Sequence, residues 1–136
     1  MAVARMIVAL VVLPCLLVGC ATDGNQLDGT EWVLVEMGPP EYPNPIPPDK
    51  EVTLEFVSGE NRITGSLVNN AYSVVYEADE SRLTVGQPGE LWSEPPEHMQ
   101  LEHGYLDALR KAEWYVVDGD RLTIDCGVTL LVYARK

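Results

Sequence analysis

Two histidines with a glutamate between them are the first candidates for metal chemistry in this chain. They lie in the segment His98-Met-Gln-Leu-Glu102-His103. Imidazole and carboxylate are common zinc ligands, but zinc-binding helices place their two histidines four residues apart. Here the spacing is five, which turns the two imidazoles about 140° apart around a helix, so they cannot share one ion. The sequence therefore predicts no metal site, and we expect no cofactor.

Nucleophilic catalysis has no recognisable residue pattern in this sequence. It needs a serine exposed at a strand-to-helix turn or a cysteine set beside a histidine, and neither occurs. Carboxylate pairs of the kind that glycosidases use are not diagnostic, because twenty-one Asp and Glu residues bring some pairs together in any small fold. Glycine motifs for phosphates or dinucleotides are missing too. We therefore expect a protein that is not an enzyme.

Asn70, Tyr72 and Tyr76 are the candidate binding residues. They share the parity of Val74, so one strand would place all of them on the same face. Amide and phenol groups on one face form a small polar patch that suits a ligand groove. Core packing, with each hydroxyl bonded locally, explains the same pattern, and both interpretations stay open.

Cys20 is the residue whose position predicts a covalent modification. Arg5 is followed by an uncharged stretch from Met6 to Val18, as in a signal peptide, and thirteen residues are too few to cross a bilayer, which takes about 20. The stretch ends in Leu-Val-Gly19-Cys20, which resembles the lipobox of bacterial lipoproteins. We expect cleavage of residues 1–19 between Gly19 and Cys20, and acylation of the Cys20 thiol with palmitate-type chains.

The lipid would be the membrane contact of an otherwise acidic protein. Residues 20–26 form a short tether and residues 27–136 a single domain, and loss of the signal peptide leaves eight Lys and Arg against twenty-one Asp and Glu, a charge of −13. This charge repels nucleic acid and anionic headgroups, so acyl chains must supply the attraction. We expect a monomer without nucleic-acid partners. It would lie on the periplasmic face of the outer membrane in a cell with two membranes, and otherwise on the outer face of the cell membrane.

Cys126 is the thiol that remains after processing, because Cys15 leaves with the signal peptide and Cys20 is acylated. The processed chain therefore has no intramolecular disulfide. Cys126 shares its parity with Leu122 and Ile124, so we expect a buried, inert thiol.

The elements that position these residues are mostly β-strands. Apolar residues alternate with polar ones at a period of two, and turn residues separate the runs at 58–61, 79–81 and 118–120. Trp32 is expected to anchor the core. The stretch 38–50 holds six prolines and is predicted to be a long ordered loop.

One helix is predicted over Pro96 to Ala112, with Arg110 and Lys111 in its last turn. Its apolar face would consist of Leu101, Tyr105, Ala108, Leu109 and Ala112. Glu102 lies off this face, so we expect it in solvent. The expected fold class is α+β, with about eight strands in a strongly curved antiparallel sheet, partly barrel-like, packed against this amphipathic helix.

The order of motifs resembles the META/HslJ domain family of small bacterial lipoproteins and secreted proteins. The motifs that carry the resemblance are Leu27-Asp-Gly-Thr-Glu-Trp32, Leu54-Glu-Phe56, Ile63-Thr-Gly-Ser66, Asn69-Asn-Ala-Tyr72 with Tyr76, Met99-Gln-Leu-Glu102 with Tyr105-Leu-Asp-Ala-Leu109, and Gly119 to Thr123 with Leu130 to Tyr133. Many members carry a cysteine pair where this chain has Asn69 and Glu94, so the resemblance implies no disulfide or redox role here.

Two functions follow from these observations. The resemblance implies a non-enzymatic envelope protein with a role in envelope stress or in binding a protein or small ligand. The alternative is a periplasmic inhibitor of a basic hydrolase such as a lysozyme or protease, which would use the acidic surface or the proline-rich loop 38–50 as its contact.

Overall fold

The computed structural model describes residues 26–87, 89–90 and 100–136. The predicted signal peptide, its predicted cleavage site at Gly19, the predicted acylation site Cys20 and His98 lie outside the described residues. Within the described part, the chain forms no helix that is long and apolar enough to span a membrane.

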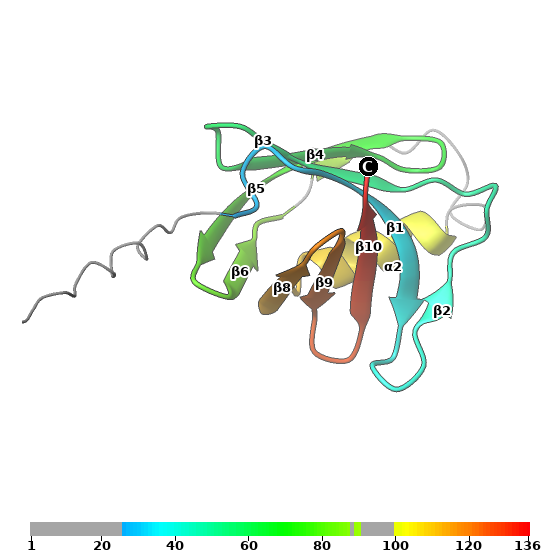
Figure 1. The fold of residues 1–136 in the computed structure, drawn as a ribbon. Helices are drawn as coiled ribbons and strands as arrows, with labels where there is room; N and C mark the ends of the chain where they lie inside the picture. The colour runs from blue at the N-terminus through cyan, green and yellow to red at the C-terminus, as the bar shows by residue number, and fades with distance from the viewer. Residues whose placement is uncertain (1–25, 88, 91–99) are drawn as a thin grey trace, which may run out of the picture.

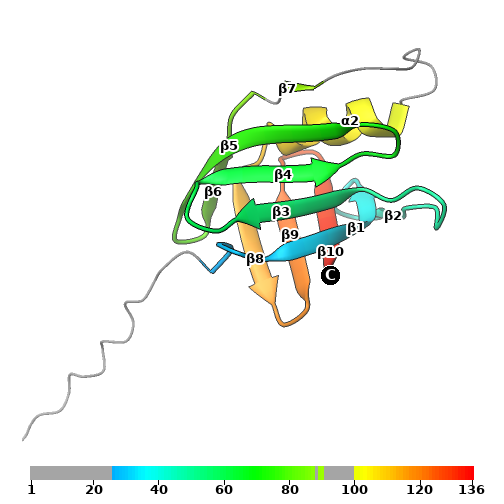
Figure 2. The ribbon, with the colours of Figure 1, turned by 90° about the horizontal axis from the view of Figure 1, so that it is seen from above.

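Eight antiparallel strands close into a barrel, as Figures 1 and 2 show. Neighbours along the chain pair with one another, and β10 pairs back onto β1 to close the ring. The weakest seam lies between β6 and β8, where Arg82 opposite Trp114 is the ladder pair. The expected curved antiparallel sheet is thereby confirmed. Its strands are β1 (Glu31–Gly38), β3 (Thr53–Val57), β4 (Arg62–Ser66), β5 (Ala71–Asp79), β6 (Arg82–Val85), β8 (Trp114–Asp118), β9 (Arg121–Asp125) and β10 (Leu130–Arg135).

Two strands of two residues each extend this ring. β7 (Gly89–Glu90) pairs with β5, and β2 (Asn44–Pro45) pairs with the end of β1. The proline-rich stretch was predicted to be a loop, and β2 is a small addition to that prediction. Pro45 is tolerated because β2 lies at the edge of the sheet, where a missing N–H breaks no ladder.

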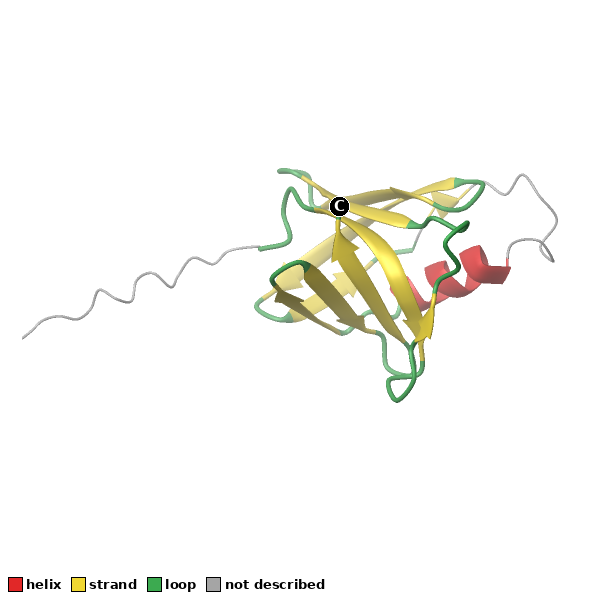
Figure 3. Cartoon of the chain, turned by 45° about the vertical axis from the view of Figure 1, so that its right-hand side comes forward, coloured by secondary structure: helices red, strands yellow, loops and turns green. Residues whose placement is uncertain are grey.

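Helix α2 (Gln100–Leu109) lies behind β9 and β10 in Figure 1 and is drawn in red in Figure 3. It ends three residues before the predicted end at Ala112. Lys111 and Ala112 donate their N–H groups to the carbonyls of Ala108 and Leu109, and such three-residue bonds tighten and end a helix. The prediction that placed Arg110 and Lys111 inside the last turn was therefore wrong.

The face that α2 buries was predicted correctly in part, because Tyr105, Ala108 and Leu109 are buried and Leu101 and Ala112 pack against the core, but Glu102 was placed wrongly. The buried residues of α2 are Glu102, Tyr105, Leu106, Ala108 and Leu109. Leu101 is only partly buried, while Glu102, expected in solvent, is 1% exposed. The backbone N–H of Asn69 donates to Glu102 Oε2 at 2.9 Å, which lowers the cost of burying the carboxylate, whereas Oε1 is buried without a hydrogen-bond partner among the described residues.

The core fills the inside of the barrel as the alternation predicted. Trp32 and Cys126 are both buried, and burial raises the pKa of the Cys126 thiol to about 12. The described core residues and the strand pairings of the barrel all lie between Leu27 and Arg135. The part of the chain that begins at Ala21 therefore contains every described core residue and every described strand pairing.

Candidate functional site

Three tyrosine hydroxyls form a continuous line through the core. The Tyr72 hydroxyl of β5 lies 2.8 Å from that of Tyr105 of α2, and the latter lies 3.0 Å from that of Tyr133 of β10. The Tyr72 hydroxyl also donates to the Thr53 carbonyl of β3 at 2.8 Å. This line of hydrogen bonds connects α2 to β3 and β5 at one end and to β10 at the other.

The Thr53 carbonyl, at one end of this line, fixes the direction of every hydrogen bond in it. A carbonyl oxygen only accepts, so the single hydroxyl hydrogen of Tyr72 is used on Thr53. Tyr105 must then donate to Tyr72, and Tyr133 must donate to Tyr105. Burial is the main cause that raises the pKa of all three phenols well above 10, so the line stays protonated at neutral pH.

Gly65 of β4 leaves the space that this line needs. It stands opposite Tyr72 in the β4–β5 ladder. A Cβ added at Gly65 would lie 2.1 Å from the Thr53 carbonyl oxygen and 2.8 Å from the Tyr72 hydroxyl. Only glycine therefore allows the Tyr72 ring to cross β4 and reach β3.

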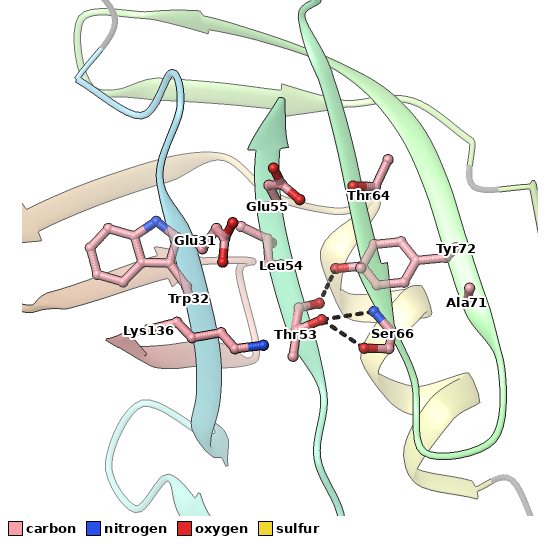
Figure 4. A pocket seen from close by; sticks show the side chains of 11 residues that line it. Glu31, Trp32, Thr53, Leu54, Glu55, Thr64, Ser66, Ala71, Tyr72 and Lys136 are labelled. Atoms are coloured by element: carbon pink, nitrogen blue, oxygen red, sulfur yellow. Dashed lines mark hydrogen bonds between the residues drawn. The ribbon is translucent and has the colours of Figure 1, made fainter. Parts of the chain in front are cut away.

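A groove of about 500 Å³ lies over β1, β3, β4 and β5, on the outer side of the barrel wall that these strands form. Figure 4 shows it from close by. The outward-facing members of its lining alternate with buried neighbours such as Trp32 and Leu54, which places the groove on the outer face of the barrel. It is lined by Glu31, Trp32, Thr53, Leu54, Glu55, Thr64, Gly65, Ser66, Ala71, Tyr72 and Lys136.

Two carboxylates stand side by side in this groove. Glu31 of β1 is directly opposite Glu55 of β3 in the ladder, and both side chains are exposed. Within the part of the chain that the structure describes, neither forms an ion pair, and Lys136 at the groove makes none either. Like charges directly opposite each other destabilise a sheet, so a cation placed between them would be stabilising.

Hydroxyl groups supply the neutral part of the groove. The Thr53 hydroxyl lies 2.9 Å from that of Ser66 and accepts the Ser66 backbone N–H at 2.8 Å. These contacts, drawn as dashed lines in Figure 4, take the place of ladder bonds between the ends of β3 and β4. Thr53 therefore belongs to both sides of the wall, with its carbonyl in the tyrosine line and its hydroxyl in the groove.

The structure separates the three residues predicted from the sequence as binding candidates. Tyr72 is 4% exposed and contributes to the groove lining. Tyr76 is 2% exposed and packs edge-on against Phe56, with ring centroids 5.0 Å apart. Asn70 is half-buried in the turn before β5, where its carbonyl accepts the Leu67 N–H at 2.6 Å.

Glu31 and Glu55 were missed in the sequence because no local pattern joins them. They are neighbours only through the pairing of β1 with β3. Among the described residues, no group of three His, Cys, Asp or Glu side chains has the geometry of a metal site.

Comparisons with known proteins agree on the fold. The family model described as the META domain matches residues 25–136. The NMR structure of a protein from Burkholderia xenovorans is 20% identical, with a TM-score of 0.67, and the match covers 81% of this chain and 83% of that one. A crystal structure of a DUF4847 family protein from Bacteroides vulgatus is 14% identical, with a TM-score of 0.60, over 80% of this chain and 94% of that one. No curated protein matches.

Proposed function

The chain belongs to the META domain family, and on that premise we propose that it is a lipid-anchored envelope protein that binds a small polar ligand without transforming it. The ligand carries an ammonium or guanidinium group that lies between the carboxylates of Glu31 and Glu55. The hydroxyls of Thr53, Thr64 and Ser66 bind its neutral polar groups.

The opposed pair Glu31–Glu55 is the observation that supports this proposal most strongly. Small molecules usually bind in concave sites of roughly 300–1,000 Å³ in which a few well-placed polar groups fix their orientation, and this groove measures about 500 Å³. Two carboxylates without a described ion-pair partner are complementary to a cation. The hydroxyl row beside them favours a ligand that also carries hydroxyl or amide groups.

Thermal shift of the protein that begins at Ala21 tests the proposal, with glucosamine, putrescine and arginine amide as probes. A ligand that binds only the folded state raises the melting temperature. We expect a rise with at least one probe, and loss of that rise in the double variant Glu31→Gln/Glu55→Gln. Glu77→Gln, an exposed glutamate of β5 outside the groove lining, is the control and should keep it. If none of the three cations raises the melting temperature, the proposed ligand class is wrong.

The anchor and the cellular role are tested separately. We propose that acyl chains on Cys20 hold the domain to the periplasmic face of the outer membrane, or to the outer face of the cell membrane in an organism with one membrane, where it contributes to tolerance of envelope stress. Mass spectrometry of the native protein should show a chain that begins at an acylated Cys20, and Cys20→Ala should move the protein to the soluble fraction. A chain that still begins at Met1 would contradict the anchor. Unchanged tolerance after gene deletion, across a panel of envelope stresses, would contradict the role.

A further inference from the structure

The turn between β1 and β2, residues 39–43, exposes an aromatic side chain. Tyr42 is 76% exposed, and among the described large apolar side chains only Val128, at 79%, is more exposed. Single exposed apolar residues are common and need no explanation by themselves. What distinguishes Tyr42 is the rigidity, the charge and the position of the segment that carries it.

The segment that presents Tyr42 is restrained by backbone hydrogen bonds and by prolines. The Tyr42 N–H donates to the Pro39 carbonyl at 3.0 Å, and the Ile46 N–H donates to the Val35 carbonyl at 2.9 Å. Ile46 packs against the core, and each of the six prolines between residues 39 and 48 has its own φ angle fixed by its ring. A segment that is already ordered loses little conformational entropy on binding, so this tyrosine is well prepared to act as an anchor.

Acidic residues surround the tyrosine in the sequence. Between residues 36 and 51 the chain carries Glu36, Glu41, Asp49 and Glu51 against the single cation Lys50. An aromatic anchor with an acidic surround is complementary to a positively charged protein surface, which it attracts over a distance and then contacts through the ring.

The described chain enters the barrel far from this turn. Asp28 Oδ1 accepts the Gly59 N–H at 2.9 Å, and the Gly29 N–H donates to the Phe56 carbonyl at 2.8 Å, which fastens the entry to the turn between β3 and β4. The eight residues of β1 then lead away from it, over about 25 Å at the usual rise of a strand. Figure 1 shows the blue start of the described chain and the cyan turn on different sides of the barrel. A tether at the entry therefore leaves Tyr42 free for a partner.

We propose that the turn 39–43 is a protein-docking element whose Tyr42 ring inserts into a concave surface of a basic protein. This inference is independent of the groove, because the groove lies beside the start of β1 and the turn follows its end. Small cations should therefore bind equally well to the wild type and to Tyr42 variants.

Binding of the protein that begins at Ala21 to immobilised c-type lysozyme, cationic trypsin and ribonuclease A tests the proposal, because all three are basic and have clefts. We expect measurable affinity for at least one of them. The Tyr42→Ala variant should weaken that affinity at least tenfold, while Tyr42→Phe stays within about threefold. Val128→Ala removes an equally exposed apolar side chain elsewhere and should change it less than twofold.

Melting temperatures of the variants show whether each one is folded, and Tyr42→Ala should melt within a few degrees of the wild type because the ring is exposed. Absence of binding to all three proteins would overturn the proposal. So would a folded Tyr42→Ala variant that binds as tightly as Val128→Ala.

Discussion

The two sides of the barrel wall at Thr53 differ in how their polar groups are paired. On the inner side, the hydroxyls of Tyr72, Tyr105 and Tyr133 form a line in which each donates to the next group, ending on the Thr53 carbonyl. On the outer side, Glu31 and Glu55 face each other without an ion pair among the described residues. One residue of β3 contributes to both sides.

This difference separates residues that stabilise the fold from residues that suit a ligand. Polar groups that are fully bonded inside a protein fix the structure and have nothing left to offer a ligand. A pair of like charges on a surface costs stability and can be relieved by a ligand of opposite charge. We therefore expect disruption of the inner line to cause large losses of stability. Removal of one of the two outer carboxylates should cause a small gain.

Alkaline pH should produce the largest effect, because it acts on the whole inner line at once. The pKa of each buried phenol is raised well above 10, so above pH 10 the unfolded state releases protons that the folded state keeps. Stability is full below pH 10 and falls as the pH rises, by about 1.4 kcal/mol per pH unit for each phenol. Because each unfolded phenol is only half ionised at pH 10, the three together should lose about 3 kcal/mol between pH 10 and 11. Urea unfolding at pH 8, 10 and 11 measures this loss, and equal stability at all three values would contradict a buried line.

Gly65→Ala should be the most damaging single substitution. Its Cβ would lie 2.1 Å from the Thr53 oxygen, so the β3 backbone and the Tyr72 ring must both move, at a cost of about 3 kcal/mol. Gly104→Ala is the matched control. The nearest atom to its new Cβ is 3.9 Å away, and the exchange on an exposed helix position should stabilise the protein by about 0.5–1 kcal/mol. Thermal unfolding of both variants should therefore give shifts of opposite sign, and equal shifts would count against the close contact at Gly65.

Tyr105→Phe should cost less, because it removes one oxygen without moving the backbone. The variant leaves the Tyr133 hydrogen without its acceptor in the core, which costs about 2 kcal/mol. Tyr133→Phe removes only the first donor of the line and should cost about 1 kcal/mol. Chemical denaturation of the two variants checks this order. The reverse order would show that the hydrogen bonds run in the other direction.

Glu55→Gln should give the smallest change and the opposite sign. Removing one of two facing carboxylates relieves repulsion and should stabilise the ligand-free protein by about 0.5 kcal/mol. Glu77→Gln serves as the reference for a simple loss of one surface charge. A destabilised Glu55→Gln variant would mean that the carboxylate has a favourable partner of its own.

The interior of the fold was largely predictable from the sequence, because alternation along a strand decides which side chains face the core. Trp32 and Cys126 are buried as expected, and the burial of Tyr72 agrees with the core-packing interpretation of its strand face. The errors lie in α2, where Glu102, expected in solvent, is buried beside the partly buried Leu101. That position depends on the Asn69 N–H, which the chain brings to the helix from 33 residues away, and helical periodicity contains no information about such a donor.

The groove was not predictable, because it exists only through strand pairing. Glu31 and Glu55 become neighbours when β1 pairs with β3, and Lys136 joins them because β10 closes the barrel against β1. The predicted candidates Asn70, Tyr72 and Tyr76 share a strand face, so local reasoning could group them. The register between distant strands, which local patterns do not specify, decides what the outer wall presents.

Chemical-shift mapping by NMR on the protein that begins at Ala21 tests most directly whether the outer wall is the binding surface. Each of glucosamine, putrescine and arginine amide is titrated into labelled protein while the backbone amides are followed. The largest shifts should cluster at Glu31, Thr53, Glu55 and Ser66, and they should disappear in the Glu31→Gln/Glu55→Gln variant. Shifts centred elsewhere, or no shift with any of the three cations, would contradict the assignment of ligand binding to this groove.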